Sequence, residues 1–258
     1  MTEPATPPAT LPATLPATTP APTPAPTPAT GLAERIRWYA RGLGQLLITL
    51  GVVVLLFCGY ELWITGLYTR QQQHDLGKGL DRTWAQAPPA SPRTPLRYVV
   101  GKGIARIWFP TLGKGAHYVV VEGVGTDDLK KGPGHYPTSA RIGAIGNVVI
   151  SGHRTTYLAP FNRVDELHAG DPIVLETQSF WYTYTVTSES VVQPTAIEVT
   201  YPVPGHLGSR PTQRLLTLTT CNPKYSARTR LIVHATLTAP LAKGSGVVPA
   251  ALDQVLKG

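Results

Sequence analysis

Cysteine is scarce in this sequence. Only two of the 258 residues are cysteines, Cys58 within a long apolar run and Cys221 in a region with the texture of a soluble domain. Because a thiol inside an apolar span cannot easily pair with one outside it, we expect no disulfide. The unpaired Cys221 is then either a buried bystander or a reactive group, and the residues around it must decide between the two.

Charged residues are also sparse and are not grouped. They make up 15% of the chain, and the net charge of +8 comes from Lys and Arg residues that are scattered, with no dense basic run and no interleaved aromatic residues. This pattern is not that of a nucleic-acid-binding protein. An excess of positive charge instead suits a protein that works beside an anionic membrane or cell wall.

Residues 1–30 have few bulky apolar side chains and are rich in Ala, Thr and Pro. Such a tract cannot form a packed core. We therefore expect it to be disordered, with extended polyproline character.

An uncharged apolar run of about 19 residues, 42–60, lies between Arg41 and Glu61 and matches the thickness of a bilayer when helical. Basic residues precede this run and the next one after it is Arg70, so the positive-inside rule places the N-terminus in the cytoplasm and the remainder outside. A cleaved signal peptide is the alternative, but the run is too long and begins too far from Met1. We predict an uncleaved, single-pass anchor over 42–62.

After residue 98 the sequence has the texture of a β domain. Runs rich in β-branched and aromatic residues are separated by Gly, Pro and Asp. The predicted strands are 99–109, 116–124, 147–152, 171–176, 182–192, 214–221 and 230–238, with short helical turns at 127–131 and 160–167. Seven or eight strands with little helix indicate a sandwich or a closed barrel, and closure would remove exposed strand edges.

Alternation along the strand that ends at Cys221 places Leu216 and Leu218 on the apolar face and Cys221 on the other. On the next strand, Arg230 lies opposite the apolar face. If the two strands pair, the intervening loop holds Cys221 and Arg230 at the same end of the sheet, directed away from the core. A fixed cation favours the thiolate, which is the nucleophile. Arg228 shares the parity of Arg230 but lies in the loop, and is the second choice.

The strand 147–152 ends at Gly152-His153. A cysteine enzyme that transfers acyl groups needs a group to protonate the departing amine and to deprotonate the incoming one, and histidine titrates in the right range. A lone histidine at a strand end can equally be an exposed turn residue. The sequence contains seven histidines, so identity alone does not select His153.

Three elements resemble the sortase family of cysteine transpeptidases. The segment Thr217-Leu-Thr-Thr-Cys221 is similar to the sortase Thr-Leu-X-Thr-Cys signature, Arg230 opens the following strand, and Gly152-His153 ends an upstream strand. The resemblance extends over about 99–237. Gly-His-Arg-Thr-Thr at 152–156, together with Asn-Pro after the cysteine, is most like the class E sortases of high-GC Gram-positive bacteria.

The resemblance implies a mainly β fold, a closed eight-stranded sortase-type β-barrel with short helices. It also implies that Cys221 attacks the threonine carbonyl of a Leu-Pro-X-Thr-Gly-like or Leu-Ala-X-Thr-Gly-like signal, with Arg230 stabilising the oxyanion and His153 protonating the leaving glycine amine. The partners would be secreted proteins with a C-terminal sorting signal and a peptidoglycan precursor with a lipid II-like amine. The protein would act at the cell membrane, with its catalytic domain outside.

Two further residues are candidates for substrate binding. Thr220 could line the substrate groove or be an ordinary strand threonine, and Tyr136 could shape the pocket or simply pack. We expect no cofactor and no metal, and interpret the adjacent Asp127 and Asp128 as a helix cap.

With the resemblance included, the chain divides into six predicted segments. These are the disordered cytoplasmic tail 1–30, the basic juxtamembrane segment 31–41, the anchor 42–62, an extracellular linker 63–98, the catalytic domain 99–240 and a C-terminal tail 241–258. Two Leu-Pro-Ala-Thr units at 11–14 and 15–18 resemble part of a sorting signal, but neither is followed by Gly, so we do not expect self-processing.

Two other functions stay open at this point. An L,D-transpeptidase also uses an extracellular Cys and His, although its Ser-X-Gly-Cys type of motif is absent around Cys221. A membrane-anchored scaffold barrel without enzymatic activity would leave the thiol unreactive.

Overall fold

The computed structural model describes residues 31–60, 65–86 and 98–257. Its first helix, α1 (Gly31–Gly59), contains the whole apolar run up to Gly59 and begins before it, so it includes the basic residues expected at the membrane surface. Among the described residues, α1 is the one helix that is long and apolar enough to cross a bilayer. The tail 1–30 lies outside the described residues.

Eight strands form a closed barrel, as expected. They are β1 (Gly103–Trp108), β2 (His117–Glu122), β3 (Gly134–His135), β4 (Gly146–Ser151), β5 (Pro172–Glu176), β6 (Phe180–Val192), β7 (Arg214–Asn222) and β8 (Thr229–Ala242). Their order around the barrel is β1-β2-β3-β4-β7-β8-β6-β5, and β5 pairs with β1 to close it. The pairs β2–β3 and β4–β7 are parallel, and the others are antiparallel.

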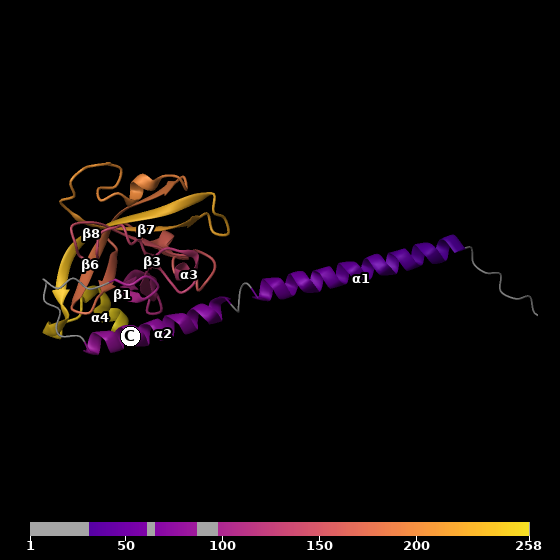
Figure 1. Cartoon of the computed structure of the whole chain (residues 1–258), viewed down its shortest axis with the longest axis horizontal. Helices are drawn as coiled ribbons and strands as arrows, with labels where there is room; N and C mark the ends of the chain where they lie inside the picture. Colours follow the sequence, from indigo (N-terminus) through magenta and orange to yellow (C-terminus); the bar gives the residue numbers. More distant parts are fainter. Residues whose placement is uncertain (1–30, 61–64, 87–97, 258) are drawn as a thin grey trace, which may run out of the picture. The chain divides into compact units, whose positions relative to one another are not determined.

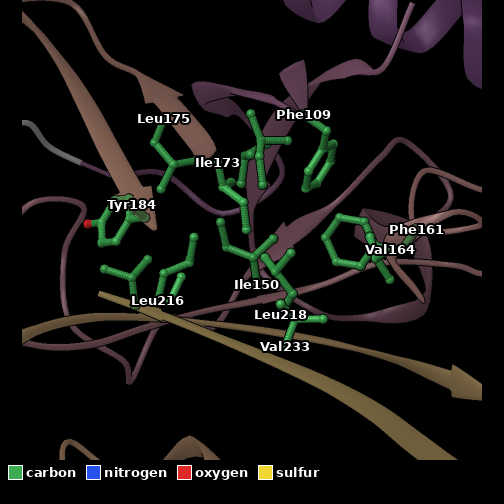
Figure 2. Packing of buried hydrophobic residues seen from close by; sticks show 14 of the residues in the cluster. Phe109, Ile150, Phe161, Val164, Ile173, Leu175, Tyr184, Leu216, Leu218 and Val233 are labelled. Atoms are coloured by element: carbon green, nitrogen blue, oxygen red, sulfur yellow. The ribbon is translucent and has the colours of Figure 1, made fainter. Parts of the chain in front are cut away.

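The barrel interior is filled by the residues that alternation assigns to it. Leu216 and Leu218 from β7 are buried together with Val233 from β8 and Ile150 from β4, in one cluster that also takes in Phe109 (Figure 2). The opposite parity therefore faces outward along β7, which leaves Cys221 on the outer face at the end of the strand.

The parallel pairing of β4 with β7 is in register from Gly146↔Arg214 to Ser151↔Thr219. Both strands therefore run toward the same end of the barrel. Because β4 ends one residue before Gly152, the chain leaves the sheet at His153 next to the last residues of β7.

Short helices lie in the connections. They are η2 (Pro110–Leu112), α3 (Thr126–Leu129), η3 (Val164–Glu166), η4 (Ile197–Thr200), η5 (Lys243–Ser245) and α4 (Ala250–Lys257). The segment expected to be a C-terminal tail thus contains the end of β8 and the helix α4. Leu252 of α4 is fully buried in a second apolar cluster with Val174 and Trp181, so α4 covers part of the barrel (Figure 1).

The segment expected to be a linker contains a helix, α2 (Thr65–Gln86), which contacts β1 and β2. Only Leu80 and Thr69 of its described side chains are buried. Its contact with the barrel is in part apolar, through the buried Leu80. It is also polar, because the Gln73 amide accepts from Val119 N–H (2.7 Å) and donates to the carbonyls of Val119 (3.0 Å) and Lys131 (2.8 Å). Most side chains of α2 are polar, so the apolar pattern by which sequence analysis finds helices is weak.

We predict that Gln73→Ala destabilises the protein by about 2 kcal/mol, because it removes three hydrogen bonds and leaves backbone groups of β2 without a partner. Urea unfolding followed by tryptophan fluorescence measures the change. The control is Gln71→Ala, whose side chain is exposed and bonds only to Asp75 of the same helix. Equal stability of the two variants would contradict the polar docking of α2.

Candidate active site

Cys221 and Arg230 are direct partners in the antiparallel pairing of β7 with β8. Cys221 is a free, half-buried thiol, and Arg230 is also half-buried, whereas Arg228 is exposed. The Arg230 guanidinium donates through Nη1 to the carbonyls of Ala227 and Thr229, both at 3.0 Å. The predicted placement of the thiol and the cation at one end of the sheet is therefore confirmed.

Hydrogen bonds on both sides of His153 hold it beside the end of β7. Before it, Gly152 N–H donates to Thr219 O (3.2 Å), and the Thr220 hydroxyl donates to Gly152 O (2.7 Å). After it, Arg154 Nη1 lies 3.4 Å from Cys221 O. The two neighbours of His153 thus contact the last three residues up to the cysteine, Thr219, Thr220 and Cys221.

Gly152 allows this close approach because of its lack of a side chain. A Cβ at Gly152 would lie 2.7 Å from the Phe161 ring, which is buried in the core. Phe161 N–H in turn donates to His153 O (3.0 Å), so the segment after β4 folds back on itself and closes against the histidine. A side chain at position 152 would displace either the core ring or the strand end that carries His153.

His153 is half-buried, with the ring of Tyr157 tilted beside it at a centroid distance of 5.1 Å. Burial lowers the pKa of His153 below its ordinary value of 6.5, because the imidazolium loses hydration that nothing nearby replaces. The neutral imidazole is therefore favoured at neutral pH. This form can accept a proton from a thiol or from an incoming amine.

Comparison with known proteins decides between the functions that the sequence leaves open. The sortase domain matches residues 109–238, half of the chain. The chain belongs to the sortase family. Its relatives include sortase E1 of Streptomyces coelicolor, 32% identical over a region that covers 80% of this chain and 59% of that protein.

Solved structures agree with this assignment. Sortase E from Streptomyces avermitilis is 42% identical, with a TM-score of 0.55, and the match covers 60% of this chain and 99% of that one. The crystal structure of sortase E1 from S. coelicolor, with a tripeptide in the active site, is 33% identical, with a TM-score of 0.55 and coverage of 60% and 99%. This sortase therefore resembles class E, as its motifs predicted, although the match spans less than two thirds of the full-length S. coelicolor protein.

The two residues predicted to bind substrate differ in their positions. Thr220 is buried, and its hydroxyl donates to Gly152 O, so it connects the end of β7 to the residue that follows β4. Tyr136 is half-buried next to β4, with its N–H donated to Val149 O. For both residues, contact with substrate stays a prediction.

Two other histidines of the barrel, His135 and His117, have different surroundings. His135 is buried, with Nδ1 2.7 Å from Glu122 Oε2 and Nε2 3.0 Å from Ala140 O, so both of its nitrogens are engaged. His117 is exposed and stacks on Trp108 at 4.3 Å. Neither has a hydrogen bond to the end of β7 among the described residues.

Asp127 and Asp128 lie in the first turn of α3, but they do not cap it. The N-cap is Gly125, which has no side chain. The Asp127 carboxylate instead pairs with Lys130 (2.9 Å) and the Asp128 carboxylate with Lys131 (3.8 Å). Both lysines come from the same short segment, so the pattern is one of local ion pairs.

We predict that the ring protons of His153 titrate in an NMR experiment with a midpoint below 6.5, because burial disfavours the charged form. Loss of the signal in His153→Gln assigns it. Tyr157→Ala exposes one side of the ring and should raise the midpoint toward 6.5. A midpoint above 6.5 in the unsubstituted protein would contradict the burial described here.

Proposed function

We propose that this sortase cleaves a C-terminal sorting signal between Thr and Gly, with Cys221 as nucleophile, and transfers the protein to an amine of a cell-wall precursor. The observation that carries the proposal is that both Arg230 and the segment containing His153 lie next to the end of β7, where Cys221 is. Arg230 is paired with Cys221 across the sheet, and the residues on either side of His153 are hydrogen-bonded to Thr219, Thr220 and Cys221.

In the proposed first step the Cys221 thiolate attacks the threonine carbonyl carbon, and the carbonyl oxygen takes the negative charge. Arg230 stabilises this oxyanion together with a backbone amide. Both hydrogen bonds of Arg230 to the described residues use Nη1, so Nε and Nη2 are available for a substrate oxygen. The C–N bond then breaks, and His153 donates its proton to the leaving glycine amine, which leaves a thioester on Cys221.

The second step reverses these roles. An amine attacks the thioester carbon, neutral His153 accepts the proton that the amine loses, and the thiolate of Cys221 departs. The product is an amide between the threonine carboxyl and the acceptor. Water in place of the amine would give hydrolysis.

The substrate class follows from the class E resemblance. We infer a Leu-Ala-X-Thr-Gly-like signal, with Leu-Pro-X-Thr-Gly as the second choice, because class E sortases favour the first. The tripeptide held in the active site of S. coelicolor sortase E1 supports a peptide-binding groove at the corresponding position here. The acceptor is proposed to be a lipid II-like amine of the peptidoglycan precursor.

We propose that α1 anchors the enzyme as a single-pass helix, with its N-terminus in the cytoplasm and the barrel outside. Its length and apolar composition support a membrane span. Arg35, Arg37 and Arg41 precede the apolar run, which favours the cytoplasmic side for that end. The secreted substrates and the wall precursor would meet the barrel on the outer face.

The proposed reaction is tested by incubating the full chain in detergent with fluorescent peptides that contain Leu-Ala-X-Thr-Gly or Leu-Pro-X-Thr-Gly, with and without an amine acceptor. Mass spectrometry should detect a thioester on Cys221 and a transpeptidation product. Cys221→Ala should abolish both while the far-UV circular dichroism is unchanged, because the side chain lies outside the core. Cys58→Ala serves as the control and should retain activity. Cleavage by the folded Cys221→Ala protein would end the assignment.

Arg230→Lys should lower kcat/KM by about 10²-fold or more, because an ammonium cannot reproduce the planar donors of guanidinium at an oxyanion. The matched change Arg228→Lys, on an exposed arginine of the same loop region, should have little effect. Steady-state kinetics with the same peptides gives both values. The reverse order of effects would transfer the proposed role to Arg228.

A further inference from the structure

A buried arginine, Arg154, lies just after the end of β4 and contacts the end of β7. Arg154 has a side chain only 4% exposed, and its Nη2 lies 2.9 Å from Asp165 Oδ2. Its Nη1 donates to Asn222 Oδ1 at 2.8 Å and lies 3.4 Å from Cys221 O. One guanidinium therefore contacts η3 through Asp165 and the end of β7 through Asn222.

These contacts are important because two of the residues directly follow residues of the candidate active site. Arg154 directly follows His153, and Asn222 directly follows Cys221. The backbone of Arg154 is held as well, since Asn162 Nδ2 donates to Arg154 O at 2.8 Å. The bonds of Arg154 thus set the spacing between the two segments that carry the proposed acid–base group and the nucleophile.

The segment after His153 needs such support. Tyr157, Leu158 and Ala159 have φ values of 52°, 63° and 44°, all in the left-handed region that side chains with a Cβ rarely adopt. A run of this kind persists only where the surrounding structure determines it. The bonds of Arg154 and Asn162 precede and follow the run, and so fix both of its ends.

The bonding of the ion pair is incomplete. Arg154 Nε and Asp165 Oδ1 are buried without a hydrogen-bond partner among the described residues. An ion pair whose arginine is buried and whose atoms are partly unsatisfied contributes little net stability, because desolvation of the charges offsets their attraction. The pair is therefore better explained by the geometry that it imposes than by a contribution to folding.

We propose that Arg154 is a positioning residue that, through Asp165 and Asn222, holds His153 in register with Cys221. It does not touch the reacting atoms. The effect on turnover rests on the proposed function. The effect on the coupling between His153 and Cys221 does not, and can be measured without a peptide substrate.

The test compares Asp165→Asn with Glu166→Gln, two neighbouring residues of η3 that each lose one carboxylate charge. Asp165 is half-buried against Arg154 and also lies 3.7 Å from Lys224 Nζ, whereas Glu166 is exposed and, among the described residues, pairs with Arg163 alone. Arg154→Lys removes the guanidinium, whose two terminal nitrogens contact Asp165 and Asn222. Asn222→Ala removes the hydrogen-bond acceptor on β7 and leaves the Arg154–Asp165 pair in place. All variants carry Cys58→Ala, so that Cys221 is the only thiol.

The first readout is the rate of alkylation of Cys221 by iodoacetamide as a function of pH. A histidine in register with the thiol adds an inflection where it titrates, since the two groups titrate as a pair. His153→Ala should lose this inflection. Arg154→Lys, Asp165→Asn and Asn222→Ala should weaken or lose it while their alkylation rate at high pH is unchanged, and Glu166→Gln should keep it.

The second readout is turnover of the sorting peptide at a temperature where circular dichroism shows each variant to be folded. The three network variants should lose about tenfold or more in kcat/KM, mainly in kcat, because misplacing a reacting group by a fraction of an ångström is costly. Glu166→Gln should not. If the network variants keep both the inflection and the turnover, or if Glu166→Gln loses as much as Asp165→Asn, the positioning role is wrong. A protein that cleaves no peptide would refute the proposed function, and the alkylation profiles would still decide the role of Arg154.

Discussion

The parallel pairing of β4 with β7 is the contact on which the candidate site depends. Parallel strands end on the same side of a sheet. The register Ser151↔Thr219 brings the residues that follow β4 beside the last residues of β7, although they are far apart in the sequence. The antiparallel neighbour β8 begins at the same end and adds Arg230. If β4 shifted against β7 by one residue, every outward side chain of β4 would turn inward, and Gly152 and Arg154, on either side of His153, would lose their bonds to the strand that carries Cys221.

The outer face of the same strands is stabilised by a polar network. Asn147 of β4 accepts from the Thr217 hydroxyl (2.7 Å), which also contacts His234 Nδ1 (3.0 Å). The Asn147 amide donates to the carbonyls of Val199 and Tyr201, both at 3.1 Å. The long connection between β6 and β7 is thereby fastened over the face of β7 that carries Cys221. Since these buried polar groups are paired, the connection can cover the sheet without a desolvation cost.

Strands were predictable wherever alternation extends over several residues. β7 and β8 are long enough for parity to identify both the core residues and the outward Cys221 and Arg230. β3 has two residues and offers no period, and α2 has few apolar side chains and is attached in part through Gln73, so neither was found. The groove-lining position considered for Thr220 stays a prediction, and strand parity does not favour it. Thr220 shares the parity of Leu218, which points inward, and not that of Cys221.

The Gly-His-Arg motif does not reveal that Arg154 is buried, or which residues it contacts. The sequence Gly-His-Arg places it next to the histidine, yet an arginine at a strand end is usually exposed, and no local pattern indicates that Asp165 and Asn222 will surround it. Only the closure of the segment 153–162 against β7 brings these partners together. Residue type and spacing in the sequence thus identify the groups that are proposed to react. They do not identify a residue such as Arg154, whose partners are brought together only by the fold.

Burial of His153 has opposite consequences for the two steps of the proposed reaction. The first step requires an imidazolium that protonates the leaving glycine amine, and burial disfavours this form by lowering the pKa of His153. The second step requires the neutral imidazole, which accepts the proton that the incoming amine loses. Burial therefore favours the protonation state that the second proposed step uses, at the expense of the state that the first one uses.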